Sequence, residues 1–119
     1  MINWVALNKD EQLNDLIELS GSGDNKAVLI FKHSTICSIS SMMKNRMERH
    51  WNFSDKELPV YYLDLRSYRE ISNKIASLFN VEHQSPQIIL INNGRCIYHT
   101  SHNDISPEKI SDVVLNINN

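Results

Sequence analysis

Long apolar segments are absent from this sequence of 119 residues. Its longest apolar runs span about five residues, whereas a helix needs roughly 20 to cross a bilayer. The N-terminal stretch, residues 1–8, has neither the basic region nor the apolar core of a secretory signal peptide. Charge of one sign is also scarce, since the formal net charge is −2 and the charged residues are scattered. The sequence therefore indicates a cytoplasmic protein that binds neither membranes nor nucleic acid.

Cysteine is scarce as well. Cys37 and Cys96 lie 59 positions apart, which does not resemble the dense disulfide framework of a small secreted domain. The composition is otherwise that of an ordinary globular chain, 41% hydrophobic and 22% charged. We expect one domain with one core over residues 1–119. In a reducing compartment, a cysteine at a helix start is expected to be reactive and not structural.

The most informative stretch joins a short apolar run to Cys37. Residues 27–31 are apolar and rich in branched side chains, which is typical of a strand buried on both faces. Cys37 follows a short polar turn and stands where a helical pattern begins, at a position where free N–H groups and the helix dipole favour negative charge. A cysteine so placed commonly has a lowered pKa and reacts as its thiolate. Apolar residues then recur at helical spacing at Ile39, Met42, Met43, Met47 and Trp51.

The other segments alternate between strand and helix patterns. Asn93-Gly94 lies between two apolar runs and is the strongest short hairpin signal, while Ser106 and Pro107 are typical of an N-cap and a first helical residue. The predicted strands are residues 4–7, 27–31, 58–64, 87–91 and 96–99, and the predicted helices are residues 10–20, 37–51, 67–79 and a last helix from residue 106. This order, βαβαβα followed by a β-hairpin and a C-terminal helix, predicts an α/β thioredoxin-like fold, with a central mixed sheet covered by helices on both faces.

Helical spacing also predicts which side chains are buried. The predicted inward residues are Leu13, Leu16, Ile17 and Ser20 in the first helix, Tyr68, Ile71, Ile75, Leu78 and Phe79 in the third, and Ile110, Val113, Val114 and Ile117 in the last. Cys96 is expected to be a buried structural cysteine. Strand alternation would place it in the core beside the final helix, away from Cys37.

Several motifs together resemble a known family. The matching segments are Phe31-Lys32-His33-Ser34-Thr35-x-Cys37-x-Ile39-Ser40, residues 64–76, His83-x-Ser85-Pro86-Gln87, Asn93-Gly94 and residues 101–105. In these the chain resembles the bacillithiol-linked monothiol bacilliredoxins, the YtxJ-like family of the thioredoxin superfamily. The resemblance implies a thioredoxin fold, thiol–disulfide exchange at Cys37, and removal of bacillithiol, a low-molecular-weight thiol, from protein mixed disulfides. Many members have Pro directly after the cysteine, where this chain has Ser38.

The segment from Cys37 to Ser40 has the form Cys-x-x-Ser. Ser40 cannot act as a resolving thiol, so chemistry at Cys37 should stop at a mixed disulfide until a second molecule resolves it. We expect the Cys37 thiolate to attack a client mixed disulfide and to carry bacillithiol away. The expected co-substrate is bacillithiol or another low-molecular-weight thiol, and the expected partners are S-thiolated client proteins and a resolving thiol or reductase.

Neighbouring residues are candidates to stabilise the thiolate. Ser38, Ile39 and Ser40 can offer helix-start N–H groups, and Ser40 can add its hydroxyl or merely cap the helix. If charged and close, His33 or Lys32 would lower the thiol pKa, although a solvated loop position is the competing interpretation for each.

A second group of residues is expected to bind substrate. The resemblance implies that the Ser85–Pro86 bond is cis, that Pro86 faces Cys37, and that the Ser85 backbone pairs with an extended client segment. The competing interpretation is a turn proline that only starts a strand. Thr35, in the turn before Cys37, completes the expected substrate-binding set.

Histidine is the remaining candidate for metal binding. None of the five pairs with a cysteine at the spacing of known zinc sites, so no metal site is expected. They are His33, His50, His83, His99 and His102.

Two other functions stay open. One is a non-catalytic thioredoxin-fold module in which a groove at Pro86 docks a peptide and Cys37 is incidental. The other is a redox sensor whose Cys37 is the target of thiolation. Exchange that depends on Cys37 argues against the first, whereas client proteins that stay thiolated while Cys37 becomes modified argue for the second.

Overall fold

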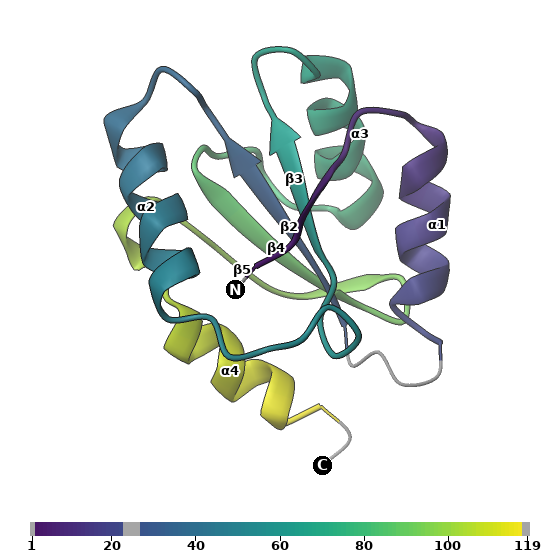
Figure 1. Cartoon of the computed structure of the whole chain (residues 1–119). Helices are drawn as coiled ribbons and strands as arrows, with labels where there is room; N and C mark the ends of the chain where they lie inside the picture. Colours follow the sequence, from purple (N-terminus) through teal and green to yellow (C-terminus); the bar gives the residue numbers. More distant parts are fainter. Residues whose placement is uncertain (1, 23–26, 118–119) are drawn as a thin grey trace.

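The strands and helices follow the predicted order (Figure 1). A computed structural model describes residues 2–22 and 27–117. The strands are β1 (Trp4–Ala6), β2 (Val28–His33), β3 (Val60–Asp64), β4 (Gln87–Asn92) and β5 (Arg95–Ser101). The helices are α1 (Glu11–Leu19), α2 (Ser38–Arg49), α3 (Arg69–Phe79) and α4 (Pro107–Leu115), with a single 3₁₀ turn, η1 (His102–Asp104), before α4.

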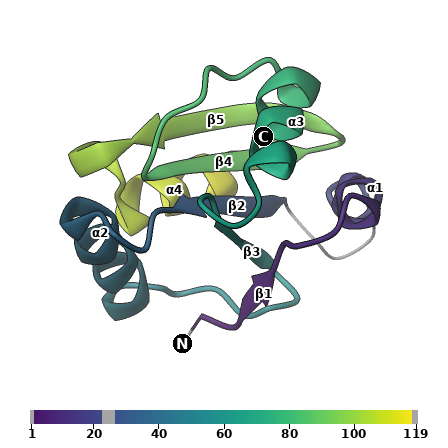
Figure 2. The same cartoon turned by 90° about the horizontal axis from the view of Figure 1, so that it is seen from above.

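The five strands form one mixed sheet in the order β1-β3-β2-β4-β5 (Figure 2). β1, β3 and β2 are parallel, whereas β4 is antiparallel to β2 and β5 is antiparallel to β4. Because β2 and β3 are parallel, both end at the same edge of the sheet, and β4 begins there. The turn that carries Cys37 therefore lies beside the start of β4.

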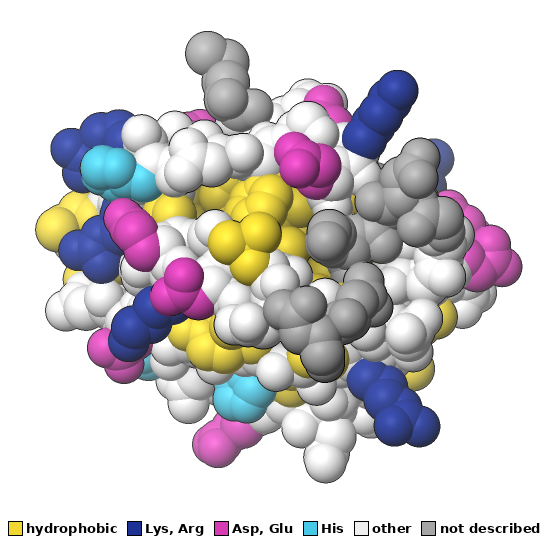
Figure 3. All heavy atoms as spheres, turned by 90° about the horizontal axis from the view of Figure 1, so that it is seen from below, with side chains coloured by type: hydrophobic (Ala, Val, Ile, Leu, Met, Phe, Trp, Pro, Cys, Tyr) yellow, Lys and Arg dark blue, Asp and Glu magenta, His cyan; other side chains and the backbone are white. Residues whose placement is uncertain are grey.

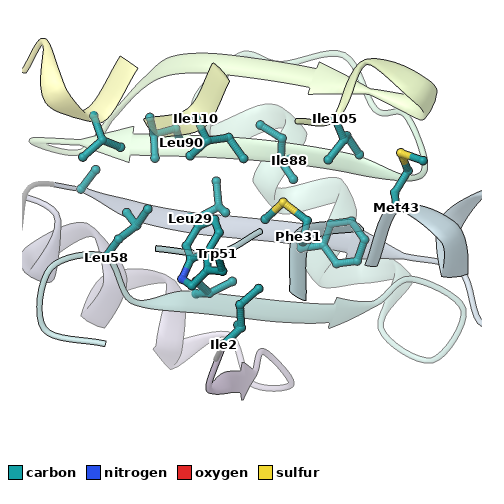
Figure 4. Close-up of a cluster of buried hydrophobic side chains, with 14 residues drawn as sticks. Ile2, Leu29, Phe31, Met43, Trp51, Leu58, Ile88, Leu90, Ile105 and Ile110 are labelled. Carbon is teal, nitrogen blue, oxygen red and sulfur yellow. The ribbon is translucent and has the colours of Figure 1, made fainter. Parts of the chain in front are cut away.

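The sheet is covered on both faces, as predicted. One apolar cluster packs α2 and α4 against the sheet (Figure 4), and the other packs α1 and α3 against the opposite face. Leu29 and Phe31 of β2 point into the first cluster, while Val28 and Ile30 point into the second. This alternation explains the continuous apolar run, because both faces of the strand are buried.

Local signals for turns and helix starts are confirmed. Asn93 and Gly94 form the two-residue hairpin loop, both with positive φ, of 51° and 76°, as the turn at this tight connection requires. The Ser106 side chain accepts the backbone N–H of Lys109, and Pro107 is the first residue of α4.

None of the described helices is long and apolar enough to cross a membrane. On the face seen from below, positive and negative side chains are interspersed (Figure 3).

Some predicted buried positions in the helices are wrong. Tyr68 is 37% exposed because α3 begins only at Arg69, and Leu78 is 53% exposed. The buried stripe of α3 includes Ser72 beside Ile75 and Phe79, so it is rotated away from Leu78. In α2 the buried stripe likewise includes a polar residue, Ser40.

Because Ser40, Met43 and Met47 form the buried side of α2, two of the apolar residues at helical spacing lie outside the core. Ile39 is 38% and Met42 58% exposed. The helix ends at Arg49, so Trp51 is buried but lies beyond it.

The predicted position of Cys96 is also wrong. Cys96 is half-buried and packs against the cluster formed with α1 and α3, not beside α4. The reason is a bulge in the hairpin: Leu90 pairs with Tyr98, but Ile91 pairs with Cys96, so Ile97 is an extra residue. Since one extra residue reverses the face of every side chain beyond it, Cys96 points to the face opposite Tyr98.

Candidate functional site

Cys37 is the N-cap of α2, immediately after the turn that follows β2. Its backbone is extended, with φ −100° and ψ 119°. Its N–H donates to the Ser34 carbonyl at 3.2 Å, and its carbonyl accepts the Ser41 N–H at 3.2 Å, the first hydrogen bond of the helix. The residue is partly exposed. The helix start predicted at this cysteine is therefore confirmed.

Ser38, Ile39 and Ser40 form the first turn of α2. Backbone N–H groups in a first turn have no acceptor within their own helix, and they carry the positive end of its dipole. Ser38 and Ile39 are exposed, whereas Ser40 is fully buried. A negative charge on the Cys37 sulfur would therefore form next to this helix end.

The Ser40 hydroxyl is held by the end of β2 and the turn after it. Its oxygen lies 2.6 Å from Nδ1 of His33 and accepts the backbone N–H of Ser34 at 3.1 Å. Burial, followed by the charge of Lys44, lowers the pKa of His33, whereas Asp64 raises it. In a neutral imidazole that is unprotonated at Nδ1, this nitrogen can accept a hydrogen bond from the hydroxyl group. Ser40 thus fastens the turn that carries Cys37.

His33 is a strand residue, so its interpretation as a solvated loop histidine is wrong. It is the last residue of β2 and is only 5% exposed. Its ring packs against those of Phe31 and Tyr62, at centroid distances of 5.8 and 5.4 Å. Its carbonyl accepts the backbone N–H of Leu65, just after β3. The end of β2 is therefore fixed from several sides.

Lys32 is fully buried, so a solvated position is wrong for it too. Successive side chains of a strand point to opposite faces, and Lys32 points to the α3 side, away from His33. Its Nζ donates to the carbonyl of Ser72 at 3.2 Å and lies 3.2 Å from Nδ1 of His83. Burial lowers the pKa of Lys32 to about 8.

The Ser85–Pro86 peptide bond is cis. It directly precedes β4, where Gln87 pairs in register with Lys32. The start of β4 therefore lies beside the end of β2 from which the chain continues into α2 (Figure 2). The Pro86 carbonyl accepts the His102 N–H at 2.9 Å. The Ser85 hydroxyl oxygen is buried and has no hydrogen-bond partner among the described residues.

Thr35 is exposed in the turn before Cys37. The structure thus brings the predicted site residues to one edge of the sheet: the Cys37 turn continues from β2, and Ser85 and Pro86 lie at the adjoining start of β4.

The sequence did not predict an exposed apolar strip near Cys37. Ile36 is 73% exposed, directly before the cysteine, and Ile39 and Met42 follow it at spacings of three on α2. The apolar periodicity was visible, but it does not tell which face of the helix turns to solvent. A surface of this kind is suited to contact another protein.

The sequence also did not predict the contact between Lys32 and His83, because the two residues are 51 positions apart. Within residues 2–22 and 27–117, no group of three or more His, Cys, Asp or Glu side chains is placed to hold a metal ion.

A family model described as monothiol bacilliredoxin BrxC matches residues 5–110. A solved structure described as a proposed oxidoreductase with a thioredoxin fold shares 29% identity, with a TM-score of 0.75, covering 92% of this chain and 91% of that one.

Two thioredoxins show the same fold at lower identity. The thioredoxin of Malassezia sympodialis shares 18% identity with a TM-score of 0.72, covering 98% of this chain and 92% of that one. Thioredoxin f of spinach chloroplasts shares 11% identity with a TM-score of 0.70, covering 98% and 94%. The predicted thioredoxin-like fold is confirmed.

Proposed function

Because the chain belongs to the monothiol bacilliredoxin family, we propose that it removes bacillithiol from protein mixed disulfides, with Cys37 as the nucleophile. Family membership supports a thiol redox function with thiol-modified proteins as substrates. The observation that carries the finer proposal is the position of Cys37, partly exposed at the N-cap of a helix of 12 residues. A thiolate is the attacking form in disulfide exchange, and at this position it would lie beside the free N–H groups of the first turn of α2.

The first step exchanges one disulfide for another. The Cys37 thiolate attacks the bacillithiol sulfur of the client mixed disulfide, and a bond forms between these two sulfurs. The bond between bacillithiol and the client breaks, and the client leaves as a thiolate that takes a proton from water. No net oxidation occurs in this step.

The second step needs a thiol from outside the Cys-x-x-Ser segment. Ser40 has no sulfur, and its hydroxyl is engaged by His33 and Ser34. Cys96 lies on β5, and burial raises the pKa of its thiol, which makes it a poor nucleophile. A second low-molecular-weight thiol, or the thiol of a reductase, therefore attacks the mixed disulfide on Cys37 and restores the thiolate.

The surrounding residues take supporting roles in this proposal. The N–H groups of Ser38, Ile39 and Ser40 stabilise the thiolate, and His33 acts by holding Ser40 and the turn. Thr35, Ser85 and Pro86 contact the client, whose extended backbone pairs with that of Ser85. The exposed apolar strip of Ile36, Ile39 and Met42 adds contact area. We place this reaction in the cytoplasm, carried out by a single thioredoxin-like domain over residues 1–119.

Intact-protein mass spectrometry tests the proposal. Reduced protein is incubated with a bacillithiolated model protein, and wild type is compared with Cys37→Ser and with Cys96→Ser as the matched control. We expect bacillithiol to move onto wild type and Cys96→Ser alone, and the model protein to be freed. A folded, reduced wild type that leaves the model protein modified would refute the proposal.

The same spectra separate the two alternatives. When bacillithiol disulfide is added as a second donor, attachment of bacillithiol to Cys37 while the model protein stays thiolated would indicate a redox sensor. If neither protein changes, the peptide-binding module becomes the better hypothesis.

A further inference from the structure

Lys32 plays no part in the exchange steps, yet its ammonium group joins three segments. Its Nζ contacts the Ser72 carbonyl of α3 and Nδ1 of His83, both at 3.2 Å. The Ser72 hydroxyl lies 3.3 Å from the same Nδ1. Since Lys32 belongs to β2 and His83 to the loop between α3 and β4, this one side chain ties strand, helix and loop together.

Burial of this charge is costly. Among the described residues there are two ion pairs, Lys44–Glu48 and Lys74–Asp10. Lys32 belongs to neither of them, so no carboxylate in this part of the chain balances its charge. An ammonium group that is buried without a carboxylate loses hydration that its hydrogen bonds only partly replace. A methionine would fill a similar volume without that cost. The charge is therefore best explained by what it holds in place.

What Lys32 holds is the loop that carries Ser85 and Pro86. His83 lies two residues before Ser85, and Gln87 follows Pro86 and pairs with Lys32 across the sheet. The Gln87 side chain closes the loop on itself, donating to the Glu82 carbonyl at 3.0 Å and accepting the Gln84 N–H at 3.3 Å. The loop is thus braced from within by Gln87 and from β2 by Lys32.

We propose that Lys32 is a positioning residue for the exchange reaction, which through His83 holds the Ser85–Pro86 segment where a client mixed disulfide meets Cys37. The inference rests on the proposed function, because it assigns the bond between Lys32 and His83 a part in client binding. It does not make Lys32 a group that touches the reacting sulfurs.

The brace depends on the protonation of both partners. His83 must be neutral at Nδ1 to accept a hydrogen bond from the ammonium group. Burial, the charge of Lys32 and that of Arg69 on α3 all lower the pKa of His83, which keeps it neutral near pH 7. Ser72 and Gln87, the other polar groups in contact with the brace or in register with it, do not titrate. Acid protonates His83 and turns the attraction into repulsion between two cations.

Kinetics on substituted proteins test the positioning role. Lys32→Met and His83→Ala remove the brace, His83→Gln keeps an acceptor, and Lys74→Met is the control because Lys74 is an exposed lysine of α3 paired with Asp10. We expect kcat/KM for a bacillithiolated protein to fall about tenfold in the first two variants, mainly through KM, as for loss of one hydrogen bond to a charged group. His83→Gln should recover most of this loss, and Lys74→Met should match wild type.

A second readout separates the loop from the nucleophile. Alkylation of Cys37 by iodoacetamide needs no docked client, so its rate should stay within about twofold of wild type in the same variants. An unchanged kcat/KM in folded Lys32→Met would overturn the proposal, and so would an alkylation rate that falls in step with kcat/KM. If Lys32→Met does not fold, the comparison of His83→Ala with His83→Gln decides in the same way.

Titration of His83 by NMR tests the brace without the reaction. Removing the Lys32 charge should move the His83 midpoint to higher pH, while Lys74→Met should leave it in place. An unmoved midpoint in Lys32→Met would reject the contact between the two groups. If wild type itself performed no exchange, the proposed function would fail, and the brace would stand or fall on this titration.

Discussion

The hydroxyl oxygen of Ser40 lies 2.6 Å from Nδ1 of the buried His33. This bond joins the fourth residue of the Cys-x-x-Ser segment to the end of the strand that leads into it. Ser40 also accepts the N–H of Ser34, so the turn around Cys37 is closed from both sides. At the position where a dithiol protein has its second cysteine, this chain has a serine whose hydroxyl group bonds to both His33 and Ser34.

Removal of the Ser40 hydroxyl group should destabilise the protein. Ser40→Ala leaves Nδ1 of His33 and the Ser34 N–H without their partner, at an expected cost of roughly 1–3 kcal/mol in the free energy of unfolding. Urea denaturation measures this change, and Ser41→Ala on the exposed side of α2 is the matched control. Equal midpoints for the two variants would show that the bond contributes nothing.

A thiol at the same position should change the reaction type. In Ser40→Cys the introduced sulfur stands three residues after Cys37 at the start of α2, within reach of it on a helix. We expect it to displace bacillithiol from Cys37 and form an intramolecular disulfide without a second molecule. Intact mass after one round of transfer would show no adduct and the loss of two hydrogens. An adduct that persists in the folded variant contradicts this expectation.

The sequence predicted those features that local patterns determine. The continuous apolar run over residues 27–31, the Asn93-Gly94 turn and the Ser106–Pro107 helix start each depend on neighbours in the chain, and each is confirmed. The cysteine at a helix start follows from a change of periodicity and is also confirmed.

Features that depend on distant partners could not be predicted in this way. Lys32 and His33 resemble a solvated turn in sequence, yet they continue β2, because Lys32 finds Ser72 and His83 and because His33 is enclosed by rings and by Ser40. The face of Cys96 depends on a bulge, which strand alternation does not indicate.

The stability of the protein should depend on His33 in acid. Burial first, and then Lys44, lower the pKa of His33, against an opposing effect of Asp64. The unfolded chain therefore binds the proton more readily, so stability is fully present above about pH 6.5 and is lost as pH falls through the lowered pKa. We expect urea unfolding at about pH 5 to need less denaturant than at about pH 7.5. His33→Phe should lose less stability over this interval, and an identical pH dependence would exclude His33 as a cause.

Ser85→Ala should separate stability from substrate binding. Because the Ser85 hydroxyl is buried without a partner in the described structure, its removal relieves an unsatisfied polar group, and the free energy of unfolding should stay equal or rise by about 1 kcal/mol. If the hydroxyl meets the client or the bound thiol, KM for the mixed disulfide should rise in the same variant. A large loss of stability would show that the hydroxyl has a structural partner after all.

The exposed apolar strip should matter only for protein clients. Ile36 and Met42 are 73% and 58% exposed, so Ile36→Ser and Met42→Ser should change the free energy of unfolding by no more than about 0.5 kcal/mol. A client protein that covers these side chains would lose apolar contact, and kcat/KM for a bacillithiolated protein should fall several-fold, by about 1 kcal/mol of binding for each truncated side chain. A small mixed disulfide of bacillithiol with free cysteine reaches Cys37 without covering the strip, so its rate should not change. Leu115→Ser is the control, because Leu115 is 62% exposed but lies on α4. An equal loss with both substrates would assign Ile36 and Met42 to the chemistry at Cys37 and not to client docking.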